Sequence, residues 1–348
     1  MNRAMRFLLP LMVLLMAAAG GSEIWRGWRA LDQPLNVAAA LRFKVAPGAR
    51  LAHVAADLAA QGVLRRPRSW VWYARWKGVA GAIKAGEYEI QPGTTARELL
   101  TRMVSGQVLL HSLTIVDGWR VRDLLSALRR NPDIVSTLPA SGELAKSDLM
   151  EKLGLAGVDA EGQFLPETYR FAGGTSDVEL LARAHAALKQ VLDTAWASHD
   201  SSTPLRSAND LLIMASIVQK ESGIPEELPK IAGLYLHRLS IGMRLQADPT
   251  VIYGLGDSYD GALRTVDLRT DGPYNTYTRT GLPPTAIALA GAAVIEATAH
   301  PQKTDALYFV ASAKGDGTHV FSATLDAHNA AVAQYLARPR QAASESAR

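Results

Sequence analysis

Apolar residues recur at intervals of three and four positions through the second half of the chain, a spacing that predicts amphipathic helices. One such stripe predicts a helix that Asn209 or Asp210 caps at its N-terminus. The members of this stripe are Leu211, Met214, Ala215 and Val218. Similar stripes predict a helix over 177–197 and a later one over 226–242, and we expect the first of these to pack beside the central helix.

The central stripe ends in an acidic side chain. One further turn brings Glu221 and Ser222 to the apolar face, whereas Lys220 points the opposite way. Gly223 and Pro225 stop the helix, so Glu221 lies in its last turn, where the negative end of the helix dipole opposes a carboxylate. Burial and the dipole both favour the protonated form, which makes Glu221 a candidate proton donor near neutral pH. The alternative is a solvated, inert Glu at a frayed helix end.

The first half of the chain repeats a pattern of strand, turn and helix. Each of three copies has a run of strand-forming residues, a turn glycine, and apolar residues six and ten positions after that glycine. The glycines are Gly48, Gly93 and Gly118. Thr94 or Thr95 is expected to cap the helix of the second copy. A further helix over 67–77 and a strand over 86–90 separate the first two copies.

Such a module resembles the LysM-like subdomains of bacterial cell-wall proteins, which implies carbohydrate binding. A structural spacer is the alternative, because strand-turn-helix repeats are common. Trp72 and Trp76 share one face of the helix over 67–77 and could stack on sugar rings, although such a face more often serves for packing.

The amino terminus predicts a membrane anchor. Arg3 and Arg6 precede an uncharged stretch, 7–22, which can extend to Trp25 and so approaches the roughly 20 residues of a spanning helix. Trp25 and Trp28 suit the membrane interface and favour a retained helix. The alternative is a signal peptide cleaved after the small residues 17–20. Either arrangement exports the bulk of the chain.

Composition excludes several classes of function. The 348 residues contain no cysteine, which removes disulfide frameworks and thiolate metal sites. The net charge is only +4 and no basic run with interleaved aromatic residues occurs, so we expect no nucleic-acid partner. The sequence has no GxSxG, P-loop or HExxH motif, and we expect neither a metal nor another cofactor. Four scattered histidines are expected to be structural: His237, His300, His319 and His328.

Two segments of the second half concentrate polar groups. Arg244, Gln246 and Asp248 alternate and would project to one side of an extended segment, with a turn where Asp248 precedes a proline. Residues 274–277 supply hydroxyl groups, an amide and aromatic faces within four positions, a density typical of a binding loop but also found in structural turns. A third segment, 161–171, combines two carboxylates with aromatic residues and suits either sugar recognition or a domain-entry loop.

Four motifs in order identify a family resemblance. They are ASIVQKES, which contains Glu221, then IGMRLQADPTVIYGLG, YNTYTRTGLPPTAIA and YFVASAKGDGTHVFSATLDAHNAAV. Together they resemble the YceG-like endolytic murein transglycosylases, the MltG family. The resemblance covers nearly the whole chain, including the anchor, the LysM-like part and the EGQFLPETY segment.

The resemblance implies a single-pass inner-membrane enzyme whose catalytic domain faces the periplasm. Such an enzyme cuts MurNAc-GlcNAc bonds within newly made glycan strands, leaves 1,6-anhydroMurNAc ends and so limits strand length. Glu221 is then the catalytic acid and base. Candidates for substrate binding are Gln246, Asp248, Tyr274, Asn275, Thr276, Ser222 and Glu167. The implied partners are peptidoglycan glycan strands and the inner membrane, with peptidoglycan synthases or division proteins as further candidates.

The chain departs from the family pattern at three positions. Gln219 stands where the family often has a second Glu, so that acid cannot be essential here and the chemistry must depend on Glu221. Thr285 and Ala290 replace a Gly and a Pro often seen after GLPP, which changes the expected loop conformation but removes no chemical group.

Two other functions fit the same residues. A hydrolytic muramidase would use Asp248 or Glu167 as base or nucleophile, and its products would carry reducing ends. A non-enzymatic peptidoglycan-binding scaffold would use the repeat module and would not need Glu221.

The predicted fold class is α+β, with one N-terminal transmembrane helix, a small LysM-like subdomain and a mixed α+β catalytic domain. The predicted parts are a cytoplasmic stub (1–6), the anchor (7–25), a juxtamembrane linker (26–40), the LysM-like module (41–130), a connector (131–158), the catalytic domain (159–338) and a disordered tail (339–348).

Overall fold

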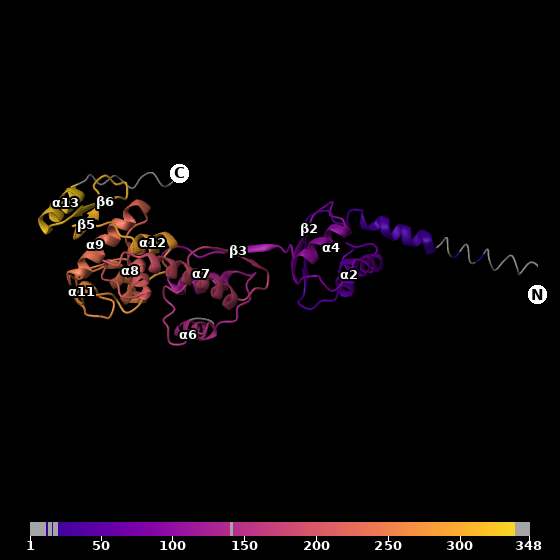
Figure 1. Ribbon diagram of the computed structural model, residues 1–348, viewed down its shortest axis with the longest axis horizontal. Helices are drawn as coiled ribbons and strands as arrows, with labels where there is room; N and C mark the ends of the chain where they lie inside the picture. Colours follow the sequence, from indigo (N-terminus) through magenta and orange to yellow (C-terminus); the bar gives the residue numbers. More distant parts are fainter. Residues whose placement is uncertain (1–11, 13–15, 17–19, 140–141, 338–348) are drawn as a thin grey trace, which may run out of the picture. The chain divides into compact units, whose positions relative to one another are not determined.

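The computed structural model describes residues 12, 16, 20–139 and 142–337, and the chain divides into two compact units (Figure 1). Unit 1 comprises Met1–His111 and Arg170–Thr175, and unit 2 comprises Ser112–Tyr169 and Ser176–Arg348. The divisions fall within strands β3 (Leu110–Thr114) and β4 (Thr168–Ala172), which pair with each other in a two-stranded sheet. Helices with small two-stranded sheets confirm the predicted α+β class.

Unit 1 is built on an antiparallel pair of strands, β1 (Leu41–Val45) and β2 (Gly86–Ile90). Alternate residues of each strand are buried, and Phe43 faces Tyr88 across the pair. Their inner face is covered by helices α2 (Leu51–Ala60), α3 (Pro67–Trp76) and α4 (Ala96–Ser105), which complete one hydrophobic core. Two residues of the predicted linker, Leu31 and Leu35, belong to this core.

The predicted repeat is confirmed as three successive strand-turn-helix elements. The helices are α2, α4 and α5 (Val121–Arg130), and the three turn glycines have φ values of 72°, 92° and 75°. All six apolar residues of the pattern are buried: Val54, Leu58, Leu99, Met103, Leu124 and Leu128. Thr95 caps α4 through a capping box with Glu98. The third helix lies in unit 2, because the division at His111 falls inside the predicted module.

The predicted anchor, 7–25, falls largely on residues outside the described part of the chain, as do the predicted stub and tail. The described N-terminal residues are helical over 20–31. No helix within the described ranges has both the length and the apolar character needed to cross a membrane.

Unit 2 is mainly helical. The predicted helix over 177–197 is confirmed as α7 (Asp177–Ser198). Strands β5 (Tyr308–Ala311) and β6 (His319–Ser322) form an antiparallel pair. The other helices are α6 (Glu143–Lys152), α8 (Ala208–Glu221), α9 (Leu228–Ser240), α10 (Asp248–Leu255), α11 (Thr265–Arg269), α12 (Ala292–Ala299) and α13 (Leu325–Ala337), with short 3-10 helices at Pro225–Glu227 and Gly256–Ser258. Helix α6 was not predicted, because the segment between 131 and 158 lacks a clear apolar stripe.

Helix α8 lies at the centre of the core of unit 2. Every residue from Leu211 to Val218 is buried, and α7, α9, α10 and α12 all pack against this helix. Ser216 Oγ accepts a hydrogen bond from Ile287 N at 3.0 Å and so binds the segment before α12 to α8. A helix enclosed in this way holds its last residue, Glu221, in a fixed position.

Two local predictions about α8 and α9 were wrong. Ser207, rather than Asn209 or Asp210, caps α8, and its side chain accepts a hydrogen bond from Asp210 N at 3.1 Å. Glu226 and Glu227 lie in the short 3-10 helix that precedes α9 rather than in its first turn, because α9 begins only at Leu228.

Candidate active site

Helix α8 ends at Glu221 because the next residue leaves the helical conformation. Ser222 has φ −144° and ψ 143°, and its Oγ accepts a hydrogen bond from Ile224 N at 3.0 Å. The predicted position of Glu221 in the last turn of the helix is therefore confirmed. Ser222 is buried, and its hydroxyl group shapes the turn that places Glu221.

The Glu221 carboxyl group is in direct contact with α9. Tyr235, on the buried face of α9, donates its hydroxyl hydrogen to Glu221 Oε1 at 2.5 Å. Burial raises the pKa of Glu221 from 4.5 to about 7, although the hydrogen bond from Tyr235 lowers it. Glu221 can consequently exist in either protonation state near neutral pH, as a general acid that becomes a general base requires.

Two charged residues act on Glu221 in opposite directions. The negative charge of Asp248 raises the pKa of Glu221, and the positive charge of Arg238 lowers it. Arg238 is 6% exposed, and its guanidinium group donates to two main-chain oxygens, that of Leu307 at 2.6 Å and that of Leu245. These carbonyl groups fix the guanidinium group, so its charge acts on Glu221 from a constant position.

Asp248 is the first residue of α10 and is exposed. Its Oδ1 accepts a hydrogen bond from the Tyr277 hydroxyl group, and burial with this contact raises the pKa of Tyr277. The prediction of an extended row through Arg244, Gln246 and Asp248 was wrong. Gln246 has φ 51° and Asp248 starts a helix, so the three side chains do not share one strand face.

The segment 274–277 is held in place by side chains that point into the protein. Asn275 is 5% exposed, and its Nδ2 donates to three main-chain oxygens at 2.7 to 3.2 Å while its Oδ1 accepts from Tyr277 N at 2.9 Å. Thr276 is 2% exposed, and its Oγ1 accepts from Ala247 N at 3.0 Å. Both residues therefore position their neighbours, Tyr277 and the residue before Asp248, and their polar atoms are occupied within the protein.

Gln246 and Tyr274 are less enclosed. Gln246 is exposed and is the one residue other than glycine with a positive φ among the described positions, while its N donates to Thr276 O at 3.1 Å. Such strain persists where surrounding contacts fix the backbone, and it leaves the side chain of Gln246 available to a ligand. The Tyr274 hydroxyl group lies 2.9 Å from Thr285 Oγ1, and its ring centroid lies 4.8 Å from that of Tyr253.

The structure thus groups part of the predicted set. The negative charge of Asp248 acts on Glu221, and Asp248 accepts a hydrogen bond from Tyr277. The main chain of Gln246 is bound to the same segment, because its N donates to Thr276 O. Glu167 lies elsewhere, exposed at the position before β4, where its main-chain oxygen accepts from Ile115 N at 2.9 Å.

Tyr235 and Arg238 were not predicted as site residues. The stripe of α9 contains both, but periodicity predicts only that they face inward and does not show which helix end they meet. Within residues 12, 16, 20–139 and 142–337, no group of three or more His, Cys, Asp or Glu side chains could hold a metal ion.

Comparison with protein families decides the classification. A profile of the YceG-like family matches residues 43–334, which is most of the chain. The chain belongs to the YceG-like family. An endolytic murein transglycosylase of Bacillus subtilis (strain 168) is 29% identical over 311 residues, which cover 85% of either protein. An endolytic murein transglycosylase of Streptococcus pneumoniae (serotype 2) is 26% identical over 318 residues, 83% of this chain and 57% of that protein. The crystal structure of a yceG-like protein from Listeria monocytogenes aligns with a TM-score of 0.48 and 24% identity over 84% of this chain and 98% of that one.

Gln219 has a structural role in this YceG-like protein. Its Oε1 accepts a hydrogen bond from Gly291 N at 2.9 Å, at the N-terminal end of α12. A glutamate at this position has the same acceptor atoms, so either residue can hold this end of α12. Gln219 therefore holds this end of α12, and the independence of the chemistry at Glu221 from residue 219 stays a prediction.

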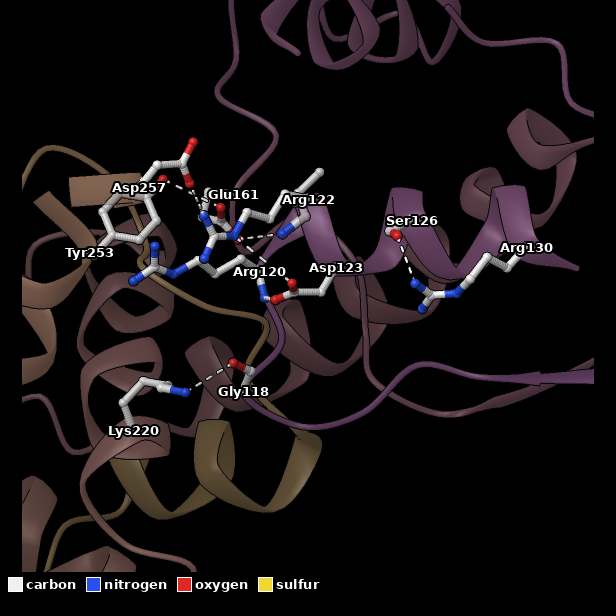
Figure 2. A network of polar contacts seen from close by, with 11 residues as sticks. Gly118, Arg120, Arg122, Asp123, Ser126, Arg130, Glu161, Lys220, Tyr253 and Asp257 are labelled. Atoms are coloured by element: carbon white, nitrogen blue, oxygen red, sulfur yellow. Dashed lines mark hydrogen bonds and ion pairs between the residues drawn. The ribbon is translucent and has the colours of Figure 1, made fainter. Parts of the chain in front are cut away.

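A second buried carboxyl group of this YceG-like protein lies at the N-terminus of α5 (Figure 2). Glu161 is 3% exposed, and its two oxygens accept from Val121 N at 2.9 Å and from the Tyr253 hydroxyl group at 3.3 Å. Burial raises the pKa of Glu161 to about 7. The Arg120 guanidinium carbon lies 4.9 Å from the Tyr253 ring centroid. Because Tyr253 belongs to α10, these contacts connect α5 to the helix that begins at Asp248.

Proposed function

We propose that this protein is an endolytic peptidoglycan lytic transglycosylase in which Glu221 acts first as the acid and then as the base. The observation that carries the proposal is one half-buried carboxyl group with a pKa of about 7 that accepts a hydrogen bond from a buried tyrosine. The YceG-like family and two relatives named as endolytic murein transglycosylases support this reaction class.

The reaction needs only one proton, which is donated and then recovered. Protonated Glu221 donates to the glycosidic oxygen of a MurNAc-GlcNAc bond, the bond breaks, and the sugar develops oxocarbenium character. The Glu221 carboxylate then accepts the proton of the 6-hydroxyl group of the same MurNAc, whose oxygen closes the 1,6-anhydro ring. Water takes no part, and Glu221 finishes in its starting state.

The groups around Glu221 suit both its protonated form and its carboxylate form. Tyr235 donates to the carboxylate that forms when Glu221 gives up its proton, and so stabilises the intermediate state. Asp248 favours the protonated form of Glu221 before the reaction, and its negative charge also stabilises a positive oxocarbenium centre. Gln246, with its exposed side chain and strained backbone, is the candidate for a hydrogen bond to the sugar.

A hydrolytic muramidase is the second candidate, because the charge of Asp248 acts directly on Glu221 and a paired carboxylate could activate water. The hydrogen bond that Asp248 accepts from Tyr277 favours the first candidate, since it engages an oxygen that a base would need.

The location of the enzyme belongs to the same proposal. Residues 7–25 anchor the chain in the inner membrane with the catalytic domain in the periplasm, and the uncharged stretch after Arg3 and Arg6 supports this orientation. The strand-turn-helix module of unit 1 is proposed to be LysM-like, and the enzyme is proposed to act on nascent glycan strands.

Mass spectrometry of products from purified sacculi tests the reaction. The wild-type protein should release fragments that end in 1,6-anhydroMurNAc, and Glu221→Gln should release none above background. Asp248→Asn should reduce the rate but leave the anhydro ends, because the ring closure needs no second carboxylate. Reducing MurNAc ends from the wild-type protein would refute the transglycosylase and establish the hydrolase.

A further inference from the structure

Positive charge is concentrated in one part of the chain. Residues 20–80 contain ten Lys and Arg but only three Asp and Glu, whereas residues 81–348 contain 25 Lys and Arg against 30 Asp and Glu. The whole chain carries +4, so this average conceals a basic segment followed by an acidic remainder. Five of the seven tryptophans also fall in this segment. Basic and aromatic residues together are the composition of a membrane interface.

Helix α3 presents these residues on one exposed face. Arg68, Trp72, Arg75 and Trp76 follow each other at helical spacing, and all four are exposed. Trp72 is 55% and Trp76 is 61% exposed, which is unusual for residues that most proteins bury. The opposite side of the same helix is packed into the core, where Trp70 is fully buried and donates to Ala96 O at 2.7 Å. The exposed tryptophans are therefore not required for the core of unit 1.

The N-terminal helix packs beside this face, and a groove lies between that helix and α3. The groove has a volume of about 660 Å³ and is lined largely by apolar side chains, among them Ile24, Trp28, Leu31, Pro67 and Trp72. A Cβ on Gly27 would lie 2.7 Å from Ser69 Oγ, so glycine permits the close approach of this helix to α3. The Trp28 ring meets the Trp76 ring edge-on, with centroids 5.3 Å apart.

We infer that the exposed face of α3, defined by Arg68, Trp72, Arg75 and Trp76, together with the adjoining groove, binds the surface of an anionic phospholipid bilayer. The tryptophan rings would enter the interface between headgroups and acyl chains, and the arginines would contact phosphate groups.

The charge around the two rings favours a bilayer over a sugar. Sugar-binding tryptophans need nearby side chains that accept hydrogen bonds from hydroxyl groups, and the face of α3 offers only arginines. The one carboxylate that lines the groove, Glu23, is already bound to Arg26 at 3.0 Å and to Arg66 at 2.8 Å. The inference does not depend on the reaction at Glu221, which lies in unit 2.

A single environment-sensitive fluorophore tests the inference, because the chain has no cysteine of its own. Full-length Trp72→Cys, labelled with a nitrobenzoxadiazole probe, is reconstituted into vesicles of phosphatidylcholine alone or of phosphatidylcholine with roughly one third phosphatidylglycerol, which makes the surface anionic. We expect a blue shift, stronger emission and quenching by brominated acyl chains only in the anionic vesicles, reversed by salt. The same probe at Lys189→Cys, on α7, should respond to neither lipid.

Charge variants supply the matched control. Arg68→Gln with Arg75→Gln removes two positive charges. It should lower the equilibrium constant for binding of this face to the anionic vesicles about 30-fold, since each basic residue near an anionic surface contributes about a factor of five. Arg129→Gln with Arg130→Gln, an exposed pair on α5, removes the same charge and should change nothing. A probe at position 72 that stays in water with both lipids would overturn the inference. So would protection of that probe by purified sacculi rather than by vesicles, which would assign the face to sugar binding.

Discussion

Replacing Glu221 with Gln should stabilise the protein at high pH, because the half-buried position of the native carboxyl group opposes its negative charge. The pKa of Glu221 is raised from 4.5 to about 7, so the folded protein keeps this proton where the unfolded chain has lost it. The contribution of protonated Glu221 is fully present below pH 4.5. It is lost as the pH rises from there through about 7.

The size of the effect follows from the shift in pKa. Each pKa unit corresponds to about 1.4 kcal/mol, so the stability cost of ionising Glu221 in the folded protein approaches about 3 kcal/mol above neutral pH. Glutamine keeps an acceptor oxygen for the Tyr235 hydroxyl group and carries no charge. The gain in the free energy of unfolding from Glu221→Gln should therefore be near zero at pH 4 and reach about 2 to 3 kcal/mol at pH 9.

Urea denaturation followed by circular dichroism at a series of pH values measures this difference. Glu226→Gln is the matched control. It also removes one carboxylate, but Glu226 is exposed to solvent. The pH dependence due to Glu161 is the same in all three proteins and cancels in the comparison. A gain for Glu221→Gln that is constant with pH, or equal to that of Glu226→Gln, would refute the assignment of a raised pKa to Glu221.

Three further predictions follow from other contacts. Tyr235→Phe removes the hydrogen bond that lowers the pKa of Glu221. The pH above which activity falls should therefore rise by about 1 pH unit, while the rate at low pH is retained. An unchanged midpoint in the pH profile would contradict this. Asn275→Ala leaves three main-chain oxygens without their donor, so it should lower the free energy of unfolding by about 2 to 4 kcal/mol and reduce activity. Denaturation and activity assays on one preparation measure both effects. Thr278→Ala, a nearby and less enclosed site, should lower the free energy of unfolding by less. Gly233→Ala would place a Cβ 2.0 Å from Gln302 O and should lower the melting temperature by several degrees, on the order of 2 kcal/mol or more, while Gly223→Ala, with open space around it, should not.

Much of the fold could be predicted because its elements follow local rules. The repeat of unit 1 combines a positive-φ glycine with apolar residues at positions six and ten, and both parts of that signal depend on residues close in sequence. Helix α7 was predicted almost to its ends because its stripe is long. The start of α10 at Asp248 was missed, because an Asp-Pro pair favours a turn and a helix start equally well, and long-range contacts decide between them.

The site could be predicted only in part for the same reason. The place of Glu221 at the end of α8 was predicted because helix periodicity and the following glycine are local signals. Asn275 and Thr276 were expected to meet substrate, yet their polar atoms are used to hold Tyr277 and Ala247. A polar residue in a sequence gives no sign of whether its hydrogen bonds go to a ligand or to the backbone of a distant segment.

In the proposed reaction, the contacts around Glu221 would let one carboxyl group serve both steps. A donor must hold its proton until substrate binds, and burial together with the charge of Asp248 raises the pKa for that purpose. A base must then exist as a carboxylate, and the Tyr235 hydroxyl group and the charge of Arg238 stabilise that form. If burial acted alone, the carboxylate would be too unstable to form when the glycosidic bond breaks. If the donors acted alone, the proton would be lost before the reaction began. A pKa of about 7 results from these opposed effects, and removing either side should slow a different step of the same reaction.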